Sequence, residues 1–182
     1  IDLGSGNSIS IKAITAAELK SHHFDVIIEY DTLLQGTDDA DTLTGTSAND
    51  RIEGSDNPFD RFGDGNDRLI GGEGDDLLIG GQNSHSTGGY YVDTYVFGNN
   101  SGNDQIIGFL AEGTGYAGEY YDRIEIVSGV NGSDITPSKN ILDRISSNAN
   151  GDAVIDLGSG NSISIKAITA AEISSKHIIV HQ

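Results

Sequence analysis

Short runs of apolar residues recur through the middle of the chain, and each follows a turn rich in glycine and aspartate. The successive segments are GTDDADTLT (36–44), GTSANDRIE (45–53), GSDNPFDRF (54–62), GDGNDRLI (63–70) and GGEGDDLLI (71–79). Side chains alternate between the two faces of a strand, so these runs predict three-residue strands such as 68–70 and 77–79. The alternation gives a stacked interior column, which is Leu43, Ile52, Phe62, Leu69, Leu78, Tyr95 and Ile106.

A nine-residue repeat underlies this pattern, with an aspartate two positions before each interior residue. The aspartates are Asp41, Asp50, Asp60, Asp67, Asp76, Asp93 and Asp104. The segment GGEGDDLLI fits GGxGxDxUx, where U is a large apolar residue, at every fixed position, so the chain resembles the RTX (repeats-in-toxin) family of secreted calcium-binding proteins. The resemblance covers roughly residues 36–126. A solvated linker has no reason to place an apolar residue at this fixed distance after each aspartate.

The residues of the repeat suit calcium. Ca²⁺ takes about six to eight oxygen ligands, which carboxylates and backbone carbonyls supply. Glycine lets the backbone curl through positive φ so that several carbonyls point at one spot. The candidate calcium-binding residues are therefore Gly36, Asp39, Asp41, Gly45, Asp50, Gly54, Asp60, Gly63, Gly65, Asp67, Gly71, Gly72, Gly74, Asp76, Gly80, Gly81, Asp93, Gly102 and Asp104.

The fold class implied by the resemblance is all-β, a right-handed parallel β-roll capped by β-hairpins at both ends. Two repeats make one turn, so alternate aspartates share an edge. This counting places Asp41, Asp60 and Asp76 on one edge and Asp50 and Asp67 on the other. Like charges stacked in this way destabilise the fold unless a cation lies between them, so calcium is expected to be structural.

Several segments depart from the repeat. Asp39 and Ala48 stand where the fourth-position glycine belongs, and the spacings on either side of Asp60 are irregular. The segment GGQNSHSTGG (80–89) is either a degenerate repeat with His85 in the aspartate position or an inserted loop. Residues 108–121 contain no motif, so calcium sites are expected to become sparse there.

A second, longer repeat surrounds the first. IDLGSGNSISIKAITAAE at 1–18 recurs unchanged at 155–172, an offset of 154 residues. Each copy predicts a hairpin around the loop GSGN, as at 152–157 and 162–165, followed by a short turn at 167–172. We expect an N-terminal cap at 1–35 that is the tail of a preceding module, a calcium-binding roll at 36–126, and a C-terminal capping region at 127–182.

Composition excludes several classes of function. The chain has 182 residues, 28 acidic against 10 basic, and a formal net charge of -18, which repels nucleic acid and disfavours a compact metal-free state. It has no cysteine, so neither a disulfide nor a thiolate zinc site is possible. No apolar run approaches the roughly 18 residues of a membrane span, and no signal-peptide pattern opens the sequence.

Catalytic motifs are missing from the sequence. The five histidines show no HExxH spacing and are interpreted as scattered surface residues: His22, His23, His85, His177 and His181. The paired carboxylates lie in glycine-rich turns rather than across an apolar cleft, which argues against a glycosidase. Aromatic residues gather where the motifs fade and are expected to be mostly core: Tyr90, Tyr91, Tyr95, Phe97, Phe109, Tyr116, Tyr120 and Tyr121.

Three functions remain. The first is a non-enzymatic, calcium-binding structural or adhesive module that binds several Ca²⁺ ions, within an extracellular or cell-surface bacterial protein. The resemblance implies type I secretion as an unfolded chain and folding on external calcium. Its expected partners are neighbouring copies of the same module and a cell-surface or sugar target, with neither nucleic acid nor membrane insertion. The alternatives are a carbohydrate-binding module, and the calcium-binding appendage of a secreted protease, lipase or epimerase.

Overall fold

Short β-strands make up most of the computed structural model, which describes residues 2–4, 7–8, 30–56, 65–81, 83, 91–115, 118–137 and 141–182. No α-helix occurs among these described residues, and the few helical turns are of the 3-10 type. The described helices are therefore all too short to cross a membrane.

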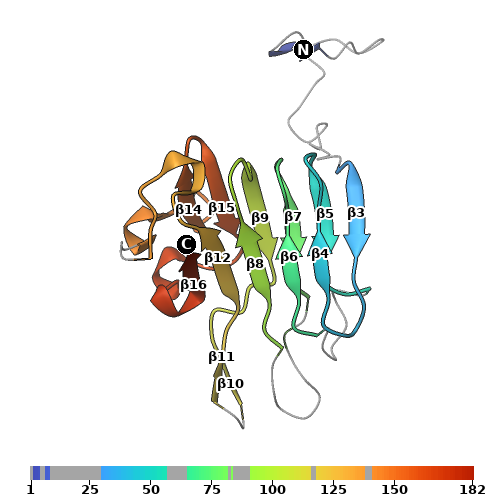
Figure 1. Ribbon diagram of the computed structural model, residues 1–182, viewed down its shortest axis with the longest axis vertical. Coiled ribbons are helices and arrows are strands. Elements are labelled where there is room, and N and C mark those ends of the chain that lie inside the picture. The colour runs from blue at the N-terminus through green and yellow to red at the C-terminus, as the bar shows by residue number, and fades with distance from the viewer. Residues whose placement is uncertain are drawn as a thin grey trace, which may run out of the picture.

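Two sheets form the body of the molecule (Figure 1). The seven-stranded sheet has the order β13-β14-β15-β9-β7-β5-β3. Its strands are β3 (Thr32–Gln35), β5 (Asp50–Glu53), β7 (Leu77–Ile79), β9 (Asn103–Ile107), β13 (Ile145–Ser147), β14 (Ala153–Gly158) and β15 (Asn161–Ile165). The five-stranded sheet has the order β16-β12-β8-β6-β4. Its strands are β4 (Thr42–Thr44), β6 (Arg68–Ile70), β8 (Thr94–Phe97), β12 (Arg123–Val127) and β16 (Ile178–His181).

Successive strands from β3 to β9 alternate between the two sheets and pair in parallel with the next strand but one. This is the predicted parallel β-roll, with two repeats per turn. Strand β3 lies in the segment assigned above to the N-terminal cap, and it pairs with β5 as the first strand of the roll.

The core of the roll is a pair of columns, one from each sheet. The register aligns Leu34, Ile52, Leu78, Ile106 and Ile165 in one sheet, and Leu43, Leu69, Tyr95, Ile124 and Ile178 in the other. Inner members such as Ile52, Leu69 and Leu78 are fully buried. The predicted inward positions are confirmed for these residues, for Tyr95 and for Ile106, whereas Phe62 lies outside the described residues.

The C-terminal region closes one end of the roll. Strands β14 and β15 form the predicted hairpin, β15 pairs in parallel with β9, and β16 pairs in parallel with β12. Four 3-10 turns complete this region: η3 (Val130–Gly132), η4 (Ile141–Arg144), η5 (Ala170–Glu172) and η6 (Ser175–His177). Its apolar side chains extend the core of the roll, including Ile135, Ile155, Leu157, Ile163 and Ile173.

His177 corrects the interpretation of all histidines as surface residues. It is only 1% exposed, its Nδ1 accepts the Ser174 N–H at 2.9 Å, and its Nε2 lies 2.8 Å from the Ala111 carbonyl oxygen. The ring also packs edge-on against Phe109 and Tyr121. A side chain that satisfies two backbone groups is a structural link, a role that HExxH-type motifs do not reveal. His22, His23 and His85 lie outside the described residues.

Two small hairpins complete the described structure. Strands β10 (Gly113–Gly115) and β11 (Gly118–Tyr120) pair antiparallel within the crossing from β9 to β12. Strands β1 (Asp2–Gly4) and β2 (Asn7–Ser8) form the N-terminal hairpin. Its register, Asp2 with Ser8 and Gly4 with Asn7, repeats that of Asp156 with Ser162 and Gly158 with Asn161, including the bulge.

Candidate metal sites in the turns

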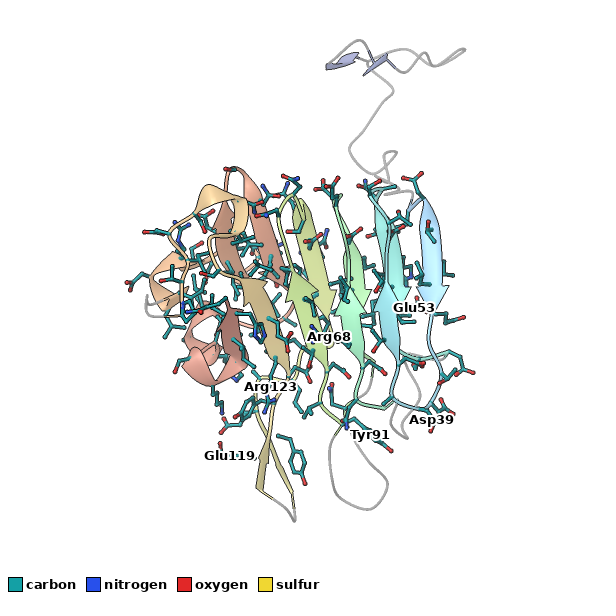
Figure 2. All side chains as sticks on the ribbon, viewed as in Figure 1. Asp39, Glu53, Arg68, Tyr91, Glu119 and Arg123 are labelled. Carbon is teal, nitrogen blue, oxygen red and sulfur yellow. The ribbon has the colours of Figure 1, made fainter. Side chains whose placement is uncertain are left out.

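The turns that connect the two sheets lie on two edges of the roll. The short-turn edge carries residues 45–49, 71–76 and 98–102, and the long-turn edge carries residues 36–41, 54–67, 80–93 and 108–122. Figure 2 shows Asp39 and Tyr91 on the long-turn edge, from which the hairpin β10–β11 also extends.

An aspartate stands at or just after the end of each turn, and a ladder of contacts joins these aspartates along each edge: the carboxylate of one accepts the backbone N–H of the aspartate in the preceding turn. On the short-turn edge, Asp76 Oδ1 accepts the Asp50 N–H at 2.8 Å, and Asp104 Oδ1 accepts the Asp76 N–H at 2.9 Å. On the long-turn edge the same contact, at 2.8 to 2.9 Å, joins Asp41 to Asp67, Asp67 to Asp93, and Asp93 to Asp122. One oxygen of each acceptor carboxylate is thus used to hold successive turns together.

These ladders show that the predicted edge assignment is wrong. Asp41 and Asp76 lie on opposite edges, as do Asp50 and Asp67. The error came from counting 54–62 and 63–70 as two repeats. Strands β5 and β6 lie in opposite sheets, so residues 54–67 make a single crossing with extra residues, and Asp60 and Gly63 lie outside the described residues. The crossing at 80–93 is lengthened in the same way, because β7 and β8 also lie in opposite sheets.

In the turns that open at Gly36, Gly45, Gly54, Gly71 and Gly80, the second oxygen of the aspartate points back to that glycine. A side chain on Gly71 would collide with Asp76 Oδ2, and one on Gly54 or Gly80 would collide with the carboxylate of Asp67 or Asp93. In the turns at Gly36 and Gly45 a threonine hydroxyl donates to this oxygen, Thr37 Oγ1 to Asp41 Oδ2 at 2.8 Å and Thr46 Oγ1 to Asp50 Oδ2 at 2.9 Å. Gly72 stands in the place of these threonines and has no such donor.

Some carboxylate oxygens are consequently buried with no hydrogen-bond donor. Among the described residues, Asp50 Oδ1 and Asp76 Oδ2 are in this state, and both side chains are at most 2% exposed. A buried charged oxygen is costly unless a cation or donor meets it. Such oxygens are the groups that a hard divalent cation would bind.

Backbone carbonyls supply further oxygens at the same places. Added side chains at Gly72 and Gly74 would meet the carbonyl oxygens of Thr46 and Ala48, and one at Gly102 would meet that of Gly74. Gly72 and Gly74 have φ of +110° and +107°, values that side chains rarely permit. Glycine therefore lets carbonyl oxygens of one turn approach the next, and the residues fit calcium.

The same geometry explains two departures from the repeat. The fourth position of each turn lies against the preceding turn on its edge, since Gly74 stacks on Ala48 and Gly65 on Asp39. Ala48 and Asp39 belong to the first described turn of each edge. Their side chains therefore avoid the contact that requires glycine in later turns.

The carboxylates of Asp76 and Asp104 are poorly stabilised as anions. Burial, with added repulsion from Asp50 and Asp75, raises the pKa of Asp76 to about 6. Burial and the charge of Asp76 raise the pKa of Asp104 to about 8. No three His, Asp or Glu side chains gather around one point in the described part of the chain, so a bound ion would rely on carbonyl oxygens as well as carboxylates.

On the long-turn edge, the last contact, between Asp93 and Asp122, differs from the earlier ones. Asn83 Nδ2 donates to Asp93 Oδ2 at 3.2 Å and to Asp122 Oδ1 at 3.0 Å, and the Leu110 N–H donates to Asp122 Oδ2 at 2.8 Å. Protein donors therefore stand between the two carboxylates. Asp122 was not among the predicted calcium-binding residues, although its position two residues before the buried Ile124 repeats the pattern of the earlier aspartates.

Comparison with known proteins is consistent with this geometry. A family model described as the RTX calcium-binding nonapeptide repeat (4 copies) matches residues 30–57 and 63–84. No curated protein matches the chain.

Two solved structures are similar at low identity. The extracellular lipase LipA from Serratia marcescens is 22% identical with a TM-score of 0.44; the match covers 82% of this chain and 21% of the lipase. A subunit of the mannuronan C5-epimerase from Azotobacter vinelandii is 22% identical with a TM-score of 0.33, over 79% of this chain and 80% of the subunit. The chain thus spans about a fifth of the length of the lipase.

Proposed function

Because this chain contains RTX calcium-binding nonapeptide repeats, which bind Ca²⁺, we propose that it is a structural or adhesive module that folds when it meets extracellular calcium. RTX repeats occur in secreted proteins, and the module is proposed to be exported unfolded through a type I channel. The observation that carries the proposal is the pair of buried, donor-free oxygens Asp50 Oδ1 and Asp76 Oδ2 among the described residues.

The mechanism follows from linkage between ion binding and folding. Where calcium is scarce, the buried carboxylates raise the free energy of the folded roll, which favours the extended chain. Where calcium is plentiful, binding to the folded state alone adds to the free energy of unfolding. Extracellular calcium modules bind at about 10⁻⁴ to 10⁻³ M, so the transition is expected near the concentration outside cells.

The proposed ligands are the turn residues of the sequence analysis, with the glycines contributing through backbone carbonyls. Under this proposal residues 1–31 belong to the tail of a preceding module and its link, the roll begins at β3 rather than at residue 36 and continues to 126, and 127–182 form the cap. The module itself performs no catalysis, and its partners are copies of the same unit. If the parent protein is an exported enzyme, these residues would keep the same structural role.

Calcium titration followed by far-ultraviolet circular dichroism tests the proposal. We expect a cooperative gain of β-structure near millimolar calcium that magnesium at the same concentration does not reproduce, because Mg²⁺ demands a tight octahedral shell. A spectrum that is unchanged between EDTA and saturating calcium would contradict folding on calcium.

A further inference from the structure

At the N-terminal end of the roll, the first side chain of each core column is only partly buried. Leu34 of β3 and Leu43 of β4 are only partly buried, whereas their register partners Ile52 and Leu69 are 0% exposed. Leu33, on the outer face of β3, is 58% exposed. Each described end strand also has a strand neighbour on one side only. This end of the roll is therefore built like an interior layer that lacks its neighbour.

The opposite end offers two free strand edges that run in matching directions. Strand β16 is the last strand of the five-stranded sheet and is parallel to β12, β8, β6 and β4 in turn. Strand β13 is the last strand of the seven-stranded sheet. It is antiparallel to β14, which is antiparallel to β15, so β13 runs in the same direction as β9 and β3. Both C-terminal edges could accept a parallel strand of the type that begins the roll.

The duplicated sequence sets the distance between these two ends in consecutive units. Under the offset of 154 residues, His177 corresponds to His23 and the end of β16 at His181 corresponds to Ile27, so only residues 28–31 separate one unit's β16 from the next unit's β3. The regular crossings on the short-turn edge contain five or six residues, as at 45–49 and 71–76. The four-residue link is thus nearly as long as one such crossing between the two sheets.

The described end of the link already lies on that edge. The Asp31 N–H donates to the Asn49 carbonyl oxygen at 2.7 Å, so residue 31 stacks on the turn 45–49. A hollow of about 390 Å³ lies beside β13, lined by apolar and charged residues that include Ile135, Ile141, Ile145 and Arg144. The hollow therefore adjoins the strand beside which β3 of the next unit would lie.

We infer that consecutive units stack end to end as one continuous roll, with β4 of one unit pairing beside β16 of the unit before it and β3 lying beside β13. The inference rests on the proposed function, since it assigns the surface through which copies of the module meet. The contact joins two different surfaces of the same unit, so it is head-to-tail and propagates along the array. The partner is a second copy of this chain. The result is a stiff rod rather than a series of independently oriented modules joined by flexible linkers.

A chain of two units tests the inference, with residues 28–181 of one copy joined directly to residues 28–182 of a second, so that only the second unit follows a complete cap. In calcium, small-angle X-ray scattering should give the profile of a single rod of about twice the length of one unit. Thermal unfolding should occur at a higher temperature than for one unit, because the junction adds a buried interface. A profile of two independently oriented rolls would overturn the stacking.

Position-matched substitutions sharpen the test. Asp41 and Gly45, which flank β4, form backbone hydrogen bonds with β6, so alternation directs the Thr44 N–H to the free edge. Thr44→Pro removes this donor without removing a described β4–β6 bond. In the second unit the substitution should abolish the rod profile and the rise in melting temperature; in the first unit it should leave both unchanged.

A second variant guards against misfolding by proline. Leu43→Lys keeps the backbone N–H of residue 43 and introduces a positive charge. At an uncovered end of the roll water can solvate this charge, whereas in a junction between two stacked units the charge would be buried without a partner. It should act only in the second unit, like Thr44→Pro. Equal effects in both units would overturn the inference. If neither unit gains β-structure with calcium, the proposed function fails instead, which the dichroism of the single chain reveals separately.

Discussion

Two aspartates, one in the roll and one in the cap, hold the same position relative to a strand but lie in opposite environments. Asp76 precedes β7 and Asp152 precedes β14, and both are largely buried. Asp76 Oδ2 has no donor among the described residues. Asp152 accepts hydrogen bonds from the Ala167 N–H at 3.0 Å and Asn148 Nδ2 at 3.1 Å, with Lys166 Nζ at 3.4 Å.

The pKa values move apart accordingly. Burial raises the pKa of Asp76 to about 6, whereas the hydrogen bonds from Asn148 and Ala167, with the charge of Lys166, lower the pKa of Asp152. The cap supplies a cation and donors to Asp152, whereas the described part of the roll supplies no donor to Asp76 Oδ2. Under the proposed function we therefore expect calcium dependence to be a local property of the turns.

Glycine substitution should show the largest contrast. Gly74→Ala in the roll places a methyl group against the Ala48 carbonyl, at a φ of +107°. Gly151→Ala in the cap has a φ of +88° but nothing within 4 Å. We expect losses in free energy of unfolding of about 3 kcal/mol and about 1 kcal/mol respectively in saturating calcium, since only the first adds a steric clash to backbone strain. Chemical denaturation measures both, and equal losses would mean that the turns do not stack as closely as described.

Removal of single carboxylate charges should separate the regions by their response to calcium. Asp76→Asn is expected to weaken calcium binding about tenfold, or about 1.4 kcal/mol, and to lower the melting temperature in calcium. In EDTA it should not destabilise, because the buried charge was unfavourable. Asp152→Asn should lower the melting temperature equally in calcium and EDTA and leave the calorimetric titration unchanged. A titration of Asp76→Asn identical to that of the parent chain would show that Asp76 is not a ligand.

The pH dependence of the metal-free chain should be opposite in sign to that of most acidic proteins. Burial raises the pKa of Asp122 to about 7 in the folded roll, and that of Asp104 to about 8, so the folded state binds protons more tightly than the unfolded chain. The contribution of these two groups to the free energy of unfolding is therefore fully present below about pH 4, the ordinary pKa of aspartate. It is lost as the pH rises through 7 to 8, where the folded-state carboxyls lose their protons.

Far-ultraviolet circular dichroism in EDTA between pH 5 and 8 measures this effect, and we expect the β-structure of the roll to decrease as pH rises. Asp152 contributes nothing to the change, because its lowered pKa matters only below this window. In saturating calcium the pH dependence should reverse, so that the roll becomes more stable as pH rises, since protons compete with the ion for the same carboxylates. β-Structure in EDTA that increases with pH would contradict the assigned burial of Asp104 and Asp122.

The internal cation of the cap should have the smallest effect. Lys166→Met keeps most of the apolar stem and removes the charge beside Asp152. The Lys166 side chain is 33% exposed, and two other donors remain on Asp152, so we expect a loss of about 0.5 to 1 kcal/mol that calcium does not alter. Denaturation in calcium and in EDTA checks this, and a loss found only in EDTA would link Lys166 to the ion sites.

Local spacing in the sequence was sufficient to predict the strands and the inward column, because an apolar residue two positions after an aspartate marks both. Local spacing was not sufficient to assign each aspartate to an edge of the roll, because a lengthened crossing such as 54–67 resembles two short repeats. Donors brought from distant segments were also beyond local pattern: Asn83 reaches Asp122, and His177 reaches Ala111, only through the fold. Asp122 itself could have been found from its spacing to Ile124.

Hydrogen exchange of individual strands tests most directly whether the acidic turns depend on a divalent ion and the cap does not. We predict that in calcium the amides of β5 and β7 and those of the hairpin β14–β15 are all protected. In EDTA the protection of β5 and β7 should collapse toward that of an unfolded chain, while β14–β15 keeps measurable protection through its own apolar core. Equal protection of β5 and β7 with and without calcium would contradict the account.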